Sequence, residues 1–141
     1  MGEIKQLITK EEWLEGFSVM KELRTHLDVE EYVSLLKVMV KEGYKMFALY
    51  DQGKIMAVTG VSILTNLYNG KHVYVYDLVT KEGERSKNYG AQLLSFIEKW
   101  GVEQGAKTVA LTSGVQRLDA HRFYENKMNY QKTSFSFKKI I

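Results

Sequence analysis

The sequence predicts one mixed α/β or α+β domain, with a sheet that carries helices on its faces. Two stretches with helical spacing come first, strand-like runs rich in β-branched and aromatic residues follow, and residues 73–112 read as a β-α-β unit. A chain of 141 residues with 45% hydrophobic and 26% charged residues suits one core. We therefore expect residues 1–141 to form a single domain.

The first two helices are predicted from apolar residues that recur every three or four positions. One runs from Glu11 to His26 behind a Thr9 cap, and the other runs from about Val29 to Glu42, with Asp28 as the N-cap and Gly43 as the stop. Each helix has one apolar face, so both are expected to pack on the sheet.

The strands are predicted from short runs bounded by turn residues. Tyr44–Tyr50 and Ile55–Asn66 read as a hairpin, Asn69-Gly70 closes a second turn, and Val73–Val79 is the most strand-like heptad. A further strand is expected at Ile4–Ile8. The remaining elements, in order, are a helix from about Ser86 to Gln104, a short strand at Thr108–Thr112, a helix from Asp119 to Lys127, and a closing strand from Tyr130 to Lys138.

Composition excludes several classes of function. Without cysteine the chain has no disulfide, thiolate metal site or cysteine nucleophile, and its three histidines lack metal-ligand spacing. The net charge of +3 is spread among acidic residues, so nucleic acid is not implied. No secretory leader or run of about 20 apolar residues is visible. We expect a cytoplasmic protein that requires no metal and binds neither nucleic acid nor membrane.

The segment Arg85–Ala91 is the best candidate for a functional site. It lies between the strand Val73–Val79 and a helix, carries two basic side chains, and contains Gly90. A helix N-terminus presents backbone N–H groups without intrahelical partners, and the helix dipole adds positive charge there. The turn is therefore a candidate pyrophosphate site, although in isolation solvated basic residues explain it better.

Two ordered motifs resemble the GNAT superfamily of acyl-CoA-dependent N-acetyltransferases. Arg85-x-x-Asn88-x-Gly90 resembles the family's Arg/Gln-x-x-Gly-x-Gly/Ala turn, and the stretch from Ala120 through Phe123-Tyr124 to Tyr130 resembles its Ala-x-x-Phe-Tyr-x-x-x-Gly-Phe/Tyr element. Asn88 and Asn129 stand where that family usually has Gly. Asn is the non-Gly residue most tolerant of left-handed backbone, so both turns are expected to keep their path.

The resemblance implies a mostly antiparallel sheet with helices on both faces and acetyl-CoA as the acyl donor. It assigns cofactor binding to the main chain of the strand and turn and to one later residue: Leu78, Val79, Arg85, Ser86, Lys87, Asn88, Tyr89, Gly90, Ala91 and Gln116. The N–H of Val79 would polarise the thioester carbonyl. Tyr124 would protonate the leaving thiolate, with a packed aromatic as its alternative role.

The acceptor side is less determined by the resemblance. Asp77 is a candidate general base, with Glu84 and a water relay as alternatives, or else it is a strand-end carboxylate that binds a backbone N–H or a cation. Arg24 and His26 would contact substrate or complement the dipole of the first helix. Tyr76 would line the pocket or simply pack.

The implied activity is direct transfer of acetyl from acetyl-CoA to a primary amine of a small molecule. A non-catalytic acyl-CoA sensor and a protein N-acetyltransferase are the alternatives. Dimers are frequent in the family, so a second copy of the chain is a candidate partner.

Overall fold

The computed structural model describes residues 2–141, which divide into two compact units. The N-terminal unit extends to Ala110, and the C-terminal unit is Leu111–Ile141. The single domain expected from sequence stays a prediction.

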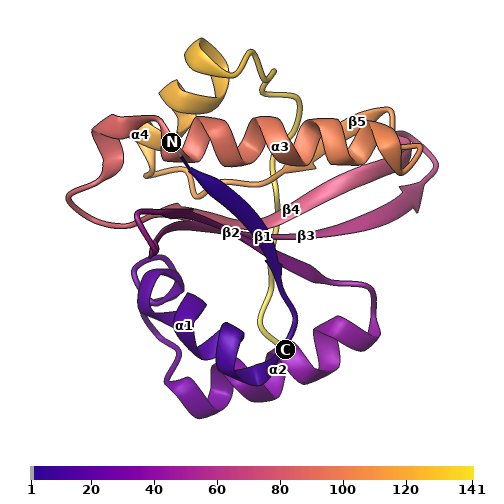
Figure 1. The fold of residues 1–141 in the computed structure, drawn as a ribbon. Helices are drawn as coiled ribbons and strands as arrows, with labels where there is room; N and C mark the ends of the chain where they lie inside the picture. Colours follow the sequence, from indigo (N-terminus) through magenta and orange to yellow (C-terminus); the bar gives the residue numbers. More distant parts are fainter. Residues whose placement is uncertain (1) are drawn as a thin grey trace. The chain divides into compact units, whose positions relative to one another are not determined.

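A five-stranded sheet with the order β1-β2-β3-β4-β5 organises the N-terminal unit. The strands are β1 (Glu3–Leu7), β2 (Lys45–Asp51), β3 (Lys54–Asn66), β4 (Gly70–Thr80) and β5 (Thr108–Leu111). The first four pair antiparallel in sequence order. Figure 1 shows α1 and α2 on one face of this sheet and α3 on the other. The mixed, mostly antiparallel sheet with helices on both faces is confirmed.

Helices α1 (Lys10–Met20) and α2 (Val29–Lys41) both begin with a capping box, formed by Thr9 with Glu12 and by Asp28 with Glu31. The two predicted caps are thereby confirmed, and α2 has the predicted extent to within one residue. The first helix is shorter than predicted. After Met20 the chain folds into tight turns, in which the N–H of Arg24 donates to the carbonyl of Met20, so Arg24 and His26 lie beyond the helix.

The fourth strand leads into a short 3₁₀ turn, η1 (Arg85–Lys87), and then into α3 (Tyr89–Glu103). Asn88 separates the two elements with φ 66°, in the left-handed region. The helix was predicted from Ser86, but that start is wrong by three residues, because a left-handed residue interrupts regular helical geometry at position 88. The expected left-handed path at Asn88 is confirmed.

Strand β4 contains a bulge at Tyr76. Gly60 of β3 is opposite Asp77 and Val61 is opposite Val75, so Tyr76 has no counterpart on β3. An extra residue of this kind bends the strand and re-aims neighbouring side chains. The bulge lies next to the segment in which the site residues Asp77, Leu78 and Val79 were predicted.

The C-terminal unit contains α4 (Leu118–Arg122), continued by one π-helical turn, η2 (Phe123–Lys127). Asn129 follows with φ 61°, again as expected for Asn at a turn. The strand predicted at Tyr130–Lys138 is wrong. Within the described residues no backbone hydrogen bond involves positions 131–141, and the exposed fractions of Phe135 and Phe137 are 81% and 93%. Alternation without a neighbouring strand does not make a ladder.

Candidate functional site

The start of α3 offers three unpaired backbone donors. Within residues 2–141, the N–H groups of Tyr89, Gly90 and Ala91 make no hydrogen bond. They are the donors that a helix N-terminus leaves without intrahelical partners. Because Asn88 turns the chain into the helix through a left-handed conformation, the turn presents these groups without requiring Gly at position 88. The backbone thus presents unpaired donors at the predicted anion site, and anion binding there stays a prediction.

The two basic side chains of the turn already have acidic partners. Arg85 Nη2 lies 3.6 Å from Oε1 of Glu22, and Lys87 Nζ lies 2.5 Å from Oε2 of Glu84. Glu22 also accepts the N–H of Glu82 at 2.7 Å, so it connects this loop to the turn that follows α1. The side chains thus hold the loop in place, and the positive charge they offer a ligand is partly compensated.

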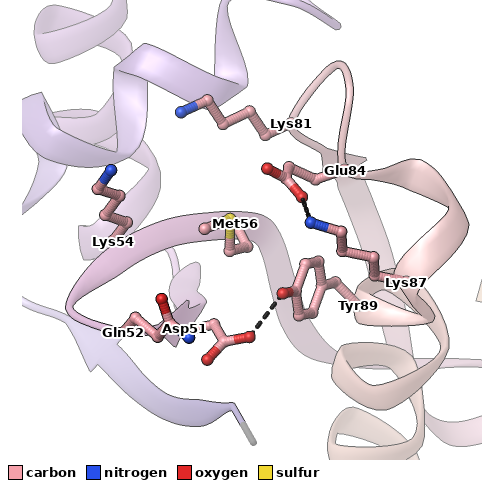
Figure 2. A pocket seen from close by; sticks show the side chains of 8 residues that line it. All are labelled: Asp51, Gln52, Lys54, Met56, Lys81, Glu84, Lys87 and Tyr89. Carbon is pink, nitrogen blue, oxygen red and sulfur yellow. Dashed lines mark hydrogen bonds and ion pairs between the residues drawn. The ribbon is translucent and has the colours of Figure 1, made fainter.

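A cavity of about 260 Å³ lies between the β2–β3 turn and the loop from β4 to α3 (Figure 2). The turn and β3 contribute Asp51, Gln52, Lys54 and Met56 to its lining. The loop and α3 contribute Lys81, Glu84, Lys87 and Tyr89. Tyr89 donates its hydroxyl to Oδ2 of Asp51 at 2.6 Å, which raises the pKa of Tyr89 to about 12. This hydrogen bond connects the start of α3 to the β2–β3 turn.

The register of β4 determines which of its amides face β3. The N–H of Lys81 donates to the carbonyl of Met56 at 2.8 Å, and Val58 is opposite Val79. Since hydrogen-bonded and non-hydrogen-bonded pairs alternate along antiparallel strands, Val79 also directs its N–H to β3. Leu78 and Thr80 direct their main-chain groups to the other side, consistent with the bond from Arg85 Nε to the Thr80 carbonyl.

At Leu78, no described strand pairs with the edge of β4 that faces away from β3. Strand β5 has four residues, and the N–H of Lys107, just before it, donates to the carbonyl of Lys71 near the beginning of β4. Four residues starting there cannot extend as far as Leu78. Among the strands of residues 2–141, none therefore pairs with this edge of Leu78, and its N–H is available to a ligand.

Asp77 is held in a buried hydrogen-bonded cluster. Its Oδ1 accepts from Arg24 Nε at 2.7 Å and its Oδ2 accepts from the Tyr44 hydroxyl at 2.8 Å. Arg24 Nη2 also donates to the carbonyl of Tyr76 at 2.7 Å, so its guanidinium spans the bulge. Asp77 therefore acts as a carboxylate that binds a cation, the guanidinium of Arg24, which is one of the predicted alternatives. The role of Asp77 as a general base stays a prediction.

Tyr44 and Gly60 are members of this cluster that the sequence did not reveal. A Cβ on Gly60 would lie 1.6 Å from the Tyr44 hydroxyl, so the tyrosine occupies the space above this glycine. Burial, together with the charge of Asp77, raises the pKa of Tyr44 well above its usual value. The contact joins residues 33 positions apart, and no local motif indicates it.

The remaining residues predicted to contact the acceptor are Tyr76, His26 and Arg24. Tyr76 contacts the rings of Tyr44 and Tyr74, with centroids 5.3 and 5.0 Å apart. His26 is exposed in the turn between α1 and α2. Arg24 retains an exposed fraction of 41% in its side chain. Packing thus accounts for Tyr76, and its contact with substrate stays a prediction, as does that of His26.

Within the C-terminal unit, Tyr124 is buried in the π-helical turn and Gln116 lies in the exposed loop before α4. The ring of Tyr124 packs between Phe123 and Tyr130. Burial raises the pKa of Tyr124, while the charge of Arg117 acts in the opposite direction. A raised pKa keeps the phenol protonated at neutral pH, which a proton donor requires.

Similarity to known proteins shows the family to which this chain belongs. The sequence pattern of the acetyltransferase (GNAT) family matches residues 8–130. The chain belongs to this family. Over their full lengths, the chain is 44% identical to the Bacillus subtilis (strain 168) protein named "Uncharacterized N-acetyltransferase YhdJ". The resemblance read from the two motifs is confirmed, and the protein is an acyltransferase of the GNAT type.

Two further relatives extend the comparison. The GNAT chain is 27% identical to the aminoalkylphosphonate N-acetyltransferase of Salmonella typhimurium over 90 residues, which are 63% of this chain and 58% of that protein. The structure of aminoglycoside N-acetyltransferase AAC(6')-Iy in complex with CoA superposes with a TM-score of 0.85 at 14% identity, covering 99% of this chain and 95% of that one. The second likeness establishes the fold alone.

Neither a cluster of metal ligands nor a membrane-spanning helix occurs within residues 2–141. No group of three or more His, Cys, Asp or Glu side chains comes together as metal ligands would. None of the described helices is both long and apolar enough to cross a bilayer.

Proposed function

We propose that this GNAT protein transfers acetyl from acetyl-CoA to a primary amine of a small molecule, by direct attack of the amine. The observation that carries the proposal is the start of α3, where three unpaired N–H groups follow Asn88 in a left-handed turn. Such a group of donors at the positive end of a helix suits a pyrophosphate. The segment from Arg85 to Ala91 would hold this part of the cosubstrate.

Leu78 is the residue whose main chain would polarise the thioester carbonyl. The sequence pointed to Val79, but the N–H of Val79 faces β3 while that of Leu78 faces the uncovered edge of β4. A backbone N–H held rigidly in a strand is a preorganised donor for developing negative charge. Leu78 and Thr80 are therefore the proposed main-chain contacts along this edge.

Tyr124 is the proposed proton donor to the leaving thiolate. The proposal rests on the motif that begins at Ala120, in which Tyr124 holds the place of the family's tyrosine. Its packing between two aromatic rings would limit the orientations of the phenol.

The amine must lose its proton before it attacks. An alkyl amine with a pKa near that of lysine is only about 0.1% neutral at pH 7. Both oxygens of Asp77 already accept hydrogen bonds, and Glu84 is paired with Lys87. We therefore propose a relay in which a chain of waters carries the amine proton to bulk solvent, so that neither Asp77 nor Glu84 takes it directly and the neutral amine attacks the thioester.

A small-molecule acceptor is supported by the likeness to an aminoalkylphosphonate N-acetyltransferase. Arg24, His26 and Tyr76 are the proposed acceptor contacts. A non-catalytic acyl-CoA sensor would be favoured if Asn88 and Asn129 changed the path of their turns. Both residues adopt the left-handed geometry that Gly would supply, and this supports catalysis over the sensor. A protein amine is the remaining alternative acceptor.

The test is an assay of CoA release from acetyl-CoA with a panel of small primary amines and an amine-bearing peptide. We expect turnover with a small amine, and about a hundredfold lower kcat for Tyr124→Phe with unchanged CoA affinity. The matched control is Tyr68→Phe, because Tyr68 is 85% exposed. Tight CoA binding without turnover on any amine would refute the catalytic proposal, and equal turnover in Tyr124→Phe would eliminate Tyr124 as the acid.

A further inference from the structure

The cavity beside the turn Arg85–Ala91 has cationic side chains that are not part of the proposed pyrophosphate site. Lys54 is the first residue of β3 and Lys81 follows β4, and both line the cavity next to Met56 (Figure 2). Neither ammonium group makes an ion pair or a hydrogen bond with any of residues 2–141. One strand and one loop thus bring two unpaired ammonium groups to the same cavity.

The acidic groups of the same cavity are already engaged. Asp51 accepts the hydroxyl of Tyr89 at 2.6 Å, which lowers the pKa of Asp51. Glu84 lies 2.5 Å from Lys87. Lys54 and Lys81 thus carry charges without a direct partner among the described residues of this cavity. Their positive charge would attract an anion that enters it.

The size of the cavity limits what it can hold. Small-molecule pockets are usually about 300–1,000 Å³, whereas this one measures about 260 Å³. It has room for one compact anionic group, and the rest of a larger ligand would lie outside it. Two of its residues, Lys87 and Tyr89, belong to the turn proposed to hold the pyrophosphate. The anion is thus expected to be attached close to that pyrophosphate.

We propose that this cavity binds the 3′-phosphate of coenzyme A, with Lys54 and Lys81 as its ligands. The inference rests on the proposed function, because it takes CoA as the cosubstrate at the neighbouring turn. The ribose joins the 3′-phosphate to the pyrophosphate by a few bonds, so both groups fall within one continuous surface of the N-terminal unit. Lysine binds phosphate as a point charge without the fixed geometry of arginine, which suits two flexible side chains at a cavity rim.

The test compares CoA with 3′-dephospho-CoA, which lacks only this phosphate, by isothermal titration. We expect the unmodified protein to bind CoA about tenfold more tightly than 3′-dephospho-CoA, as two charge-assisted contacts would provide. In Lys54→Gln/Lys81→Gln this preference should shrink to about twofold or less, with the affinity for 3′-dephospho-CoA unchanged. The preference should also weaken as salt rises.

The matched control is Lys99→Gln, which removes an equal charge from the exposed face of α3, outside the cavity. It should keep the full preference for CoA. A preference retained by the double lysine variant, or absent from the unmodified protein, overturns the 3′-phosphate site while leaving CoA binding intact. Absence of any CoA binding would instead overturn the proposed function.

Discussion

The hydroxyl of Tyr44 donates to Oδ2 of Asp77 across 2.8 Å and fills the space above Gly60. This contact fastens β4 immediately after its bulge, because Arg24 holds the other oxygen of Asp77 and the carbonyl of Tyr76. Leu78, the proposed main-chain donor, is the next residue along β4. The buried cluster therefore determines where the chemically important edge of the strand begins.

Replacing Tyr44 by Phe should destabilise the protein by about 1–3 kcal/mol. The change removes one hydroxyl and leaves a carboxylate oxygen without its partner in a side chain that is only 10% exposed. Urea unfolding measures the loss, with Tyr68→Phe as the control because Tyr68 is exposed. A loss no larger than that of the control would show that water replaces the hydroxyl without cost.

Gly60→Ala should also be destabilising, by about 1–3 kcal/mol, because the new methyl group would overlap the Tyr44 ring. The best measurement is a double-mutant cycle with Tyr44→Ala. With the ring absent, Gly60→Ala should cost much less, and the coupling energy should be at least about 1 kcal/mol. Additive effects would mean that the two residues do not share this space in solution.

The sequence predicted the elements whose signals are local. The caps at Thr9 and Asp28, the β2–β3 hairpin and the αL turns at Asn88 and Asn129 depend on residues within a few positions of one another. The end of α1 was predicted too late because the apolar spacing continues to Leu27, whereas tertiary hydrogen bonds draw Arg24 across to β4.

The rest of the site depends on contacts between distant segments. Asp77 meets Arg24 across 53 positions and Tyr44 across 33, and Asp51 meets Tyr89 across 38. A single sequence contains no record of such pairs. The side of β4 that carries the Leu78 N–H could not be predicted either, because it follows from strand register, and a shift of one residue reverses it.

Substitutions at Asn88 should separate backbone geometry from ligand contact. Asn88 has φ 66°, so Asn88→Ala should lose about 1–2 kcal/mol of stability, while Asn88→Gly should be close to neutral. Urea unfolding checks these values. Isothermal titration of CoA into Asn88→Gly then measures the contribution of the Asn88 side chain to CoA affinity. An unchanged affinity would mean that position 88 contributes to binding through its backbone geometry alone.

The acid limb of the stability curve should contain a contribution from Glu12. Its carboxylate accepts the N–H groups of Thr9 and Ile8 at 3.0 and 2.8 Å, which lowers the pKa of Glu12 below 4.5. A lowered pKa in the folded state adds stability that is complete above about pH 4.5 and is lost as the pH falls through the folded value. Glu12→Gln should therefore be less stable than the unmodified protein at pH 7, and the difference should narrow toward pH 3. Glu11→Gln, in the same helical turn but outside the capping box, is the control, and a difference for Glu12→Gln that stayed constant with pH would contradict the assignment.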